Sequence, residues 1–198
     1  MRIRSRSGGT TLLEALVSVS VLGLLMSMMF AIYRIGAVAW KSGESDVQLA
    51  QSAQLVTDRI GREAARSANT SVALDPPASP STAVSFLSPI DPGTGRPDYD
   101  AAQRSAIWHS HSVFYHDVTS SEVRQRSIDL ATPTAATTPL ANLSLERTGG
   151  TLLAREVSSC EFFFADRTLE IRLVLERKRY GNEAPDRVEL NSSVVLNN

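Results

Sequence analysis

The chain has 198 residues and a formal net charge of −1, with 42% hydrophobic and 21% charged residues. This length and composition fit one modest globular domain plus an extended element, and the near-neutral charge gives no bulk electrostatic basis for binding nucleic acid or an anionic surface. The one cysteine, Cys160, excludes an internal disulfide and a metal site built from several cysteines.

The N-terminal segment has the pattern of a membrane signal. Three arginines lie within the first nine residues, and the 19 residues of Ala15–Tyr33 carry no formal charge. As a helix, this run is nearly as long as a hydrocarbon core of about 30 Å is thick. Ser18, Ser20 and Ser27 interrupt the run, but their hydroxyls can bond to carbonyls of the preceding turn. The basic leader predicts that residues 1–9 stay in the cytoplasm and that the C-terminal bulk crosses the membrane.

Three kinds of membrane signal fit this pattern to different degrees. A cleaved secretory peptide needs a small-residue cleavage site after the apolar run, whereas Ile32, Tyr33 and Arg34 follow Ala31 directly. An uncleaved signal anchor leaves Glu14 unexplained, because a carboxylate at the edge of an apolar run is costly unless it is neutralised. The third kind accounts for Glu14 and for the glycines that precede it.

The segment around Glu14 resembles the processing motif of type IV prepilins, and reads Gly8-Gly9-Thr10-Thr11-Leu12-Leu13-Glu14-Ala15-Leu16. In that family a short basic leader ends in glycine, the leader is cut off, and an apolar helix follows with glutamate at its fifth mature position. The resemblance implies cleavage after Gly9 and N-methylation of the new amine on Thr10, with Glu14 as the fifth mature residue. Thr10 departs from the family's usual first residue, which is phenylalanine or methionine.

The resemblance and electrostatics together predict a role for Glu14. A carboxylate and an α-amine four positions apart lie close on one helix, or can meet between neighbouring subunits. In a low dielectric such a pair attracts strongly, while an unpaired carboxylate is penalised. Glu14 is therefore expected to set the axial register of a subunit in a filament. The competing interpretation is that Glu14 only caps the helix start, where the helix dipole favours a negative charge.

One long helix is predicted from about Thr11 to about Ser67, with loosening at Lys41–Gly43. Beyond Arg34 the pattern becomes amphipathic, and apolar residues recur at three- and four-residue steps: Leu49, Ala53, Val56, Ile60 and Ala64. The second half of the helix is therefore expected to lie on a sheet. A free-standing coiled coil over 41–67 is the alternative, against which Gly43 and Gly61 argue.

The proline-rich segment that begins at Asp75 ends the helical region, and strand-like runs follow it. The predicted strands are Ala83–Leu87, Ser105–Val118, Leu143–Arg147, Leu152–Arg155, Ser159–Ala165, Leu169–Arg177 and Val188–Leu196. Gly149-Gly150 is interpreted as a hairpin turn, and 88–103 and 131–141 as loops. In Leu169–Arg177, leucines and an isoleucine alternate with mostly charged residues, which predicts one buried and one solvated face.

The predicted fold class is α+β and is similar to the pilin fold: a long N-terminal helix packed on an antiparallel sheet domain. Residues 1–9 form the leader, 10–68 the helix with a membrane-spanning part over about 12–33, and 69–198 a periplasmic β-rich domain. The sheet-rich C-terminal part is similar to the minor pilins called PilW or the type II secretion pseudopilins called GspJ. Many major pilins close a C-terminal loop with a disulfide, which a chain with the single cysteine Cys160 cannot form. This difference favours a low-abundance subunit over the main structural one.

The resemblance implies a structural or priming subunit of a type IV pilus, type II secretion or DNA-uptake filament, and not an enzyme. The implied partners are the prepilin peptidase, other pilins and the inner-membrane assembly platform, and no cofactor is expected. The implied location is the bacterial inner membrane and then a periplasmic or surface filament. A membrane-anchored binding or adhesin module is the first alternative, and an anchored hydrolase the second, although the chain has no Gly-x-Ser-x-Gly elbow.

Two groups of side chains could bind a metal. His109 and His111 alternate on a predicted strand and are expected to share a face, with His116 and Asp117 nearby, but no further ligand pattern accompanies them. Asp91, Asp98 and Asp100 cluster in a loop, without the spacing of an EF-hand. Ordinary strand histidines and a solvated acidic loop are the favoured interpretations, so no metal site is assigned.

A basic stretch near the C-terminus could contact DNA if the filament served in uptake. Its residues are Arg172, Arg177, Lys178 and Arg179, and the acids Glu170, Glu176 and Glu183 lie among them. This interleaving favours a solvated strand face over a nucleic-acid site.

Overall fold

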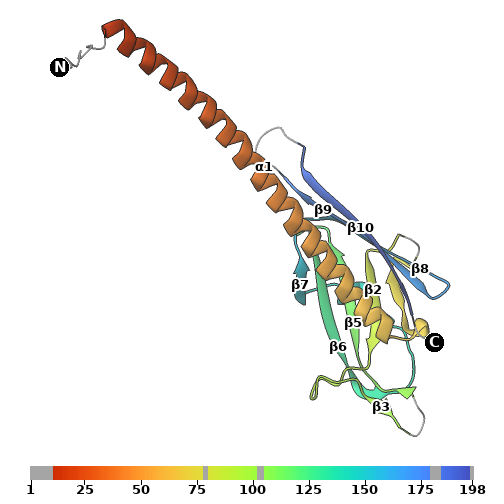
Figure 1. Cartoon of the computed structure of the whole chain (residues 1–198). Coiled ribbons are helices and arrows are strands. Elements are labelled where there is room, and N and C mark those ends of the chain that lie inside the picture. The colour runs from red at the N-terminus through yellow and green to blue at the C-terminus, as the bar shows by residue number, and fades with distance from the viewer. Residues whose placement is uncertain (1–10, 78–79, 102–104, 179–183, 197–198) are drawn as a thin grey trace, which may run out of the picture. The chain divides into compact units, whose positions relative to one another are not determined.

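The computed structural model describes residues 11–77, 80–101, 105–178 and 184–196, and its first element is one long helix. Helix α1 runs from Leu12 to Arg66 and continues unbroken through Lys41–Gly43 (Figure 1). The predicted long helix is confirmed, and the expected loosening at Lys41–Gly43 is not present. The chain divides into two compact units, and the boundary falls inside α1 between Glu44 and Ser45.

The second part of α1, from Ser45 onward, packs on the sheets through one face. The five residues predicted to form that face, Leu49, Ala53, Val56, Ile60 and Ala64, are all buried. They join the main hydrophobic core of the globular unit, which excludes a free-standing coiled coil for this segment. Gly61 lies beside Val194 of the last strand, where a Cβ atom would come within 3.2 Å of Val194 Cγ2.

The larger sheet has five antiparallel strands in the order β1-β2-β5-β6-β7. Their bounds are β1 Ala73–Asp75, β2 Ala83–Ser88, β5 Trp108–Asp117, β6 Glu122–Thr134 and β7 Thr151–Ala154. The short 3₁₀ helix η1, Asn69–Ser71, connects α1 to β1. A separate two-stranded ribbon, β3 Tyr99–Asp100 and β4 Ser105–Ala106, lies between β2 and β5 in the chain.

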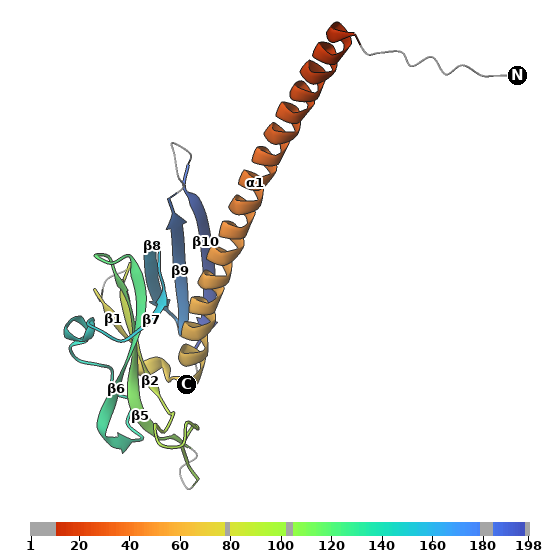
Figure 2. The same cartoon turned by 90° about the vertical axis from the view of Figure 1, so that its left-hand side faces the viewer.

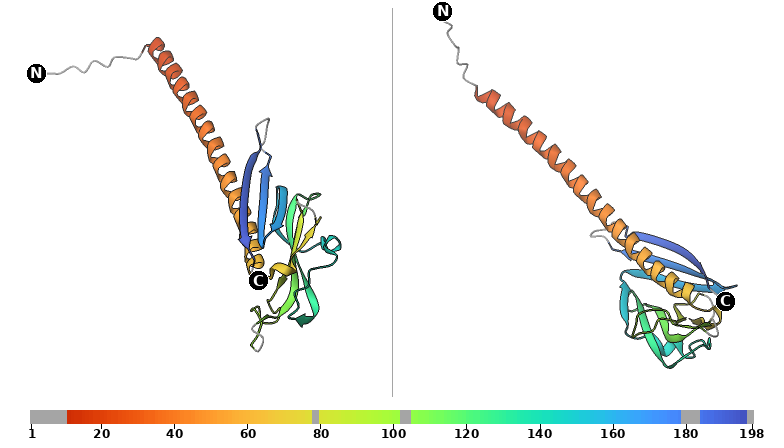
Figure 3. Two further views of the ribbon diagram at one scale, coloured as in Figure 1. Left: turned by 90° about the vertical axis from the view of Figure 1, so that its right-hand side faces the viewer. Right: turned by 60° about the horizontal axis from the view of Figure 1, so that its bottom comes forward.

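The smaller sheet has three antiparallel strands in the order β10-β9-β8. Their bounds are β8 Val157–Ala165, β9 Thr168–Arg177 and β10 Asp186–Val195. The alternation predicted for β9 is confirmed, because Leu169, Ile171, Leu173 and Leu175 are fully buried. Figures 2 and 3 show this sheet beside the second part of α1, separate from the larger sheet.

Apolar side chains from α1 and from both sheets form one core. The larger sheet contributes Val84, Phe86, Phe114 and Val123, and the smaller sheet contributes Cys160, Phe162, Leu169, Ile171, Leu173 and Leu175. Ser81 and Phe162 also exchange two backbone hydrogen bonds, of 2.8 and 3.1 Å, which join the chain just before β2 to β8. The coarse prediction of an α+β chain with a helix on antiparallel sheets therefore holds, although the sheet is split in two.

Other local predictions differ from the structure as well, and the short strand β3 lies within the predicted loop 88–103. Leu143–Arg147 was expected to be a strand, but Leu143–Glu146 is a 3₁₀ helix, η2, whose Leu143 packs with Val113 and Tyr115. Gly149-Gly150 consequently links η2 to β7 and is not a hairpin turn, although both glycines have positive φ angles of 70° and 87°. Strand β6 has no counterpart among the predicted strands, and its last residues fall in the predicted loop 131–141.

Candidate functional site

Glu14, the residue expected to set subunit register, lies in the first turn of α1. Its backbone N–H donates to the Thr11 hydroxyl oxygen at 3.3 Å, and the Ala15 N–H donates to the Thr11 carbonyl at 3.1 Å. Thr11 therefore caps the helix in the Thr-x-x-Glu arrangement of a capping box. Gly9 and Thr10, the residues of the expected cleavage and methylation, lie outside the described residues, as does the whole leader 1–9.

The Glu14 carboxylate has no ion-pair partner in the part of the chain that the structure describes. The apolar run after it has no apolar partner either, because every large hydrophobic residue from Leu12 to Trp40 is more than half exposed. Among the described helices, α1 alone is long and apolar enough to cross a membrane, by length and composition. An exposed apolar surface of this length is compatible with a membrane anchor.

The serines of the apolar run make the bonds that lipid requires. Ser18 donates to the Glu14 carbonyl at 2.8 Å, Ser20 to the Leu16 carbonyl at 2.8 Å, and Ser27 to the Gly23 carbonyl at 2.5 Å. These bonds satisfy each hydroxyl within the helix and confirm the predicted back-bonding.

Aromatic and basic residues follow the apolar run, outside the segment that resembles the processing motif. Tyr33 and Trp40 are 72% and 78% exposed, and they alternate with the chain's next basic residues, Arg34 and Lys41. Tyrosine, tryptophan and basic side chains of this kind collect at the membrane–water interface. The uncharged run itself ends at Tyr33, directly before Arg34.

The three histidines do not form a common site. His109 Nε2 lies 3.1 Å from an Asp98 carboxylate oxygen, while His111 is buried and its Nδ1 has no hydrogen-bond partner among the described residues. The β5–β6 register shifts between Trp108 and Ser110, so the simple alternation expected to place His109 and His111 on one face is interrupted there. His116 bonds to the Val157 carbonyl at 3.2 Å. Across the described residues, no three His, Cys, Asp or Glu side chains lie close enough to hold a metal.

The acidic loop uses its carboxylates for local structure. Asp91 accepts hydrogen bonds of 2.9 Å from the Gly93 N–H and from the Thr94 hydroxyl, and these bonds lower the pKa of Asp91. Asp98 pairs with His109, and Asp100 has a partner of its own. Asp91 and Asp98 of the expected cluster are thus held by different partners.

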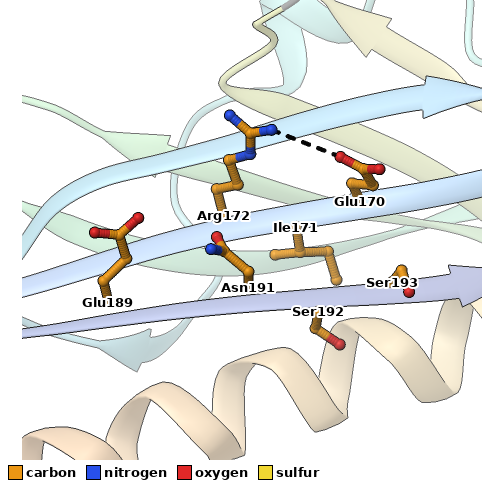
Figure 4. Close-up of a pocket in the computed structure, with 7 residues that line it drawn as sticks. All are labelled: Glu170, Ile171, Arg172, Glu189, Asn191, Ser192 and Ser193. Atoms are coloured by element: carbon orange, nitrogen blue, oxygen red, sulfur yellow. Dashed lines mark ion pairs between the residues drawn. The ribbon is translucent and has the colours of Figure 1, made fainter.

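The basic residues near the C-terminus contact different partners. Arg172 lies 3.8 Å from Glu170 and stacks over the Phe163 ring at 4.6 Å, beside a shallow polar hollow of about 320 Å³ on β9 and β10 (Figure 4). Arg177 forms a 2.7 Å ion pair with Glu156. Arg179 and Glu183 lie outside the described residues. This interleaving of charges is that of a solvated strand face.

Cys160 is buried in the core, where burial raises the pKa of its thiol to about 12. The thiol is therefore neutral and unreactive in the folded unit, as expected for a small apolar residue.

Comparison of the chain with family models, with curated proteins and with solved structures gives no match.

Proposed function

We propose that this chain is a type IV pilin-like protein, a minor pilin or pseudopilin of the PilW or GspJ kind. It is made as a precursor, cut after Gly9, methylated on Thr10 and assembled into a pilus, a type II secretion filament or a DNA-uptake filament. The precursor spans the bacterial inner membrane once, with the leader in the cytoplasm and the globular unit in the periplasm. Prepilin peptidase, the inner-membrane assembly platform and other pilins are its partners.

The observation that carries the proposal is an acidic residue in the first turn of an apolar helix. Glu14 precedes a 19-residue uncharged run and has no cation beside it within the described chain. A carboxylate in this position needs a positive partner once lipid or other helices surround it. Cleavage after Gly9 creates such a partner, the amine of Thr10, four residues away on the same chain or on a neighbouring subunit.

A substitution at Glu14 can distinguish a role in subunit register from a role in capping the helix. A glutamine at this position retains the shape and the capping ability of glutamate but carries no charge. If Glu14 sets the register through its charge, Glu14→Gln and Glu14→Ala both lose incorporation into the filament, while cleavage of the leader continues.

The test measures two quantities in cells, the fraction of the precursor that is cleaved and the amount of the chain in sheared or purified filaments. Thr11→Ala is the matched control, because it removes the hydroxyl cap and keeps the carboxylate; its incorporation is expected to stay near normal. Normal incorporation of Glu14→Gln would overturn the register role and leave Glu14 as a helix cap.

A further inference from the structure

The inner face of the larger sheet changes from apolar to polar along its strands. On β5 the core residue Phe114 is followed toward the N-terminus of the strand by Ser112 and Ser110, which point to the same face. On β2 the core residues Val84 and Phe86 are followed by Ser88 in the same way. Strands β5 and β6 continue past the end of α1 in Figure 1, and the polar part of the face lies against the last turns of α1, where Ser88 contacts Glu63 and Gln125 contacts Arg59.

The strand register gathers these polar side chains into two rows. Ser88, Ser110 and Asp129 are neighbours across β2, β5 and β6, and Ser112 pairs with Ser127 in the next row. Gln125 of β6 lies opposite Phe114, at the border with the core. Hydroxyl, amide and carboxylate groups thus replace the apolar core on three adjacent strands.

The last turns of α1 and the loop after β2 enclose a groove over this polar face. Its volume is about 330 Å³, and its lining includes Arg59, Glu63 and Arg66 of α1 and Ile90, Pro92 and Gly95 of the loop. Every one of these residues belongs to the unit Ser45–Asn198.

The inner wall of the groove contains buried polar groups with weak or missing partners. Glu63 is 6% exposed, and among the described residues its carboxylate is held by Arg59 at 3.9 Å and by the Ser88 hydroxyl at 3.5 Å. Ser110 and Ser112 are 6% and 4% exposed, and their hydroxyls make no hydrogen bond to any described residue. Buried polar groups that face an open cavity in this way are groups that a bound polar molecule would satisfy.

The charges of the lining residues indicate which class of molecule the groove can bind. Two carboxylates, Glu63 and Asp129, are balanced by two guanidinium groups, Arg59 and Arg66, so the groove has no net charge. The guanidinium groups disfavour a bare metal cation, and the carboxylates disfavour a phosphate or other anion. A neutral ligand that both donates and accepts hydrogen bonds matches this mixture of hydroxyl, amide and charged groups.

We propose that this groove binds a neutral saccharide, one or two sugar units long. Sugar hydroxyls would donate to Glu63 and Asp129 and would exchange hydrogen bonds with Ser110 and Ser112, while Ile90 and Pro92 offer an apolar lip for the C–H face of a pyranose ring. The proposal depends only on the globular unit, so it holds whether or not the chain enters a filament.

The experiment uses the full chain in a zwitterionic detergent, because detergents with sugar headgroups would compete for the groove. Maltose, cellobiose and diacetylchitobiose are titrated, with binding followed by saturation-transfer NMR, and sodium phosphate, calcium chloride and a Gly-Ser-Gly peptide serve as comparison probes. At least one sugar is expected to bind saturably, and Ser110→Ala/Ser112→Ala is expected to weaken it by about tenfold through two lost hydrogen bonds.

The matched control is Ser192→Ala/Ser193→Ala, which makes the same change in the hollow of similar size on β10 and is expected to leave sugar binding unchanged. If the groove double variant does not fold, Asp129→Ala at the exposed rim takes its place, and it is expected to weaken the same sugar several-fold. Absence of saturable binding by all three sugars would overturn the proposal. Binding that the groove variants leave unchanged would overturn it as well, and so would binding of phosphate, calcium or the peptide in place of the sugars.

Discussion

The Arg177 guanidinium donates to the Ser45 hydroxyl at 3.3 Å, and this bond fastens the end of β9 to α1 at the first residue of the globular unit. The same guanidinium also donates to Gln48 at 3.2 Å and to the Glu156 carboxylate at 2.7 Å. One side chain therefore joins α1, the residue before β8 and the end of β9, next to the boundary between Glu44 and Ser45.

Replacing Arg177 with alanine is expected to destabilise the globular unit. The loss should be about 1–2 kcal/mol, because one partly buried ion pair and two weaker hydrogen bonds disappear together. Urea unfolding of the full chain in detergent, followed by the fluorescence of the buried Trp108, measures the change. The control is Arg172→Ala, which removes a half-exposed 3.8 Å pair and should cost less than about 0.5 kcal/mol. Equal losses for the two variants would show that Arg177 is an ordinary surface residue.

Gly150 is expected to tolerate alanine far less well than its neighbour Gly149. Both have positive φ angles, but a Cβ atom on Gly150 would collide with the Gln125 carbonyl of β6, whereas a Cβ atom on Gly149 would meet nothing within 4 Å. Gly149→Ala should therefore cost about 1 kcal/mol for the left-handed backbone alone, and Gly150→Ala about 2–4 kcal/mol for strain and overlap together. Thermal unfolding of the two variants provides the comparison, and similar midpoints would contradict the close approach of Gly150 to β6.

The stability of the globular unit is expected to fall in mild acid because of two buried histidines. Burial lowers the pKa of His111 and that of His116 below the ordinary value of 6.5. As the pH falls below about 6.5, the unfolded chain therefore binds more protons than the native unit. The free energy of unfolding is unaffected by the two histidines above that pH, and it decreases as the pH falls from about 6.5 toward their lower native pKa values.

His111→Leu tests this pH dependence directly. The variant removes one of the two groups, together with an Nδ1 atom that no described residue hydrogen-bonds, so it should match or exceed the wild type in stability at pH 7. Between pH 7 and pH 5 it should lose less stability than the wild type, as measured by urea unfolding at several pH values. Parallel pH profiles for the two proteins would show that His111 does not titrate in this way.

The sequence predicted correctly those helices and strands whose apolar residues recur at regular spacing on one face. The helix face that includes Val56 and Ile60, and the alternation along β9, are signals of this kind, and both were confirmed. Strand β6 was missed because it alternates weakly: on its inner face Val123 is followed by Gln125, Ser127 and Asp129, which line the groove and not the core. Its conformation is fixed by pairing with β5, which no short window of sequence reveals.

The run Leu143–Arg147 was wrongly assigned to a strand for a related reason. Its apolar residues suggested pairing, but Leu143 packs into a small cluster with Val113 and Tyr115, and Arg147 bonds to Asp75 at 3.0 Å and to Thr82 at 2.9 Å. These distant contacts favour a 3₁₀ turn. The polar groove was equally hidden, since Ser88, Ser110 and Asp129 come from three separate strands and meet only through the register.

The mass of the N-terminal peptide distinguishes a processed chain from an unprocessed one. Intact-mass and N-terminal peptide mass spectrometry of the protein isolated from its native membrane should show a chain that begins at Thr10 and is one methyl group heavier than the unmodified sequence from that residue. A chain that retains Met1 through Gly9, or one cut after the apolar run near residue 33, would contradict the account.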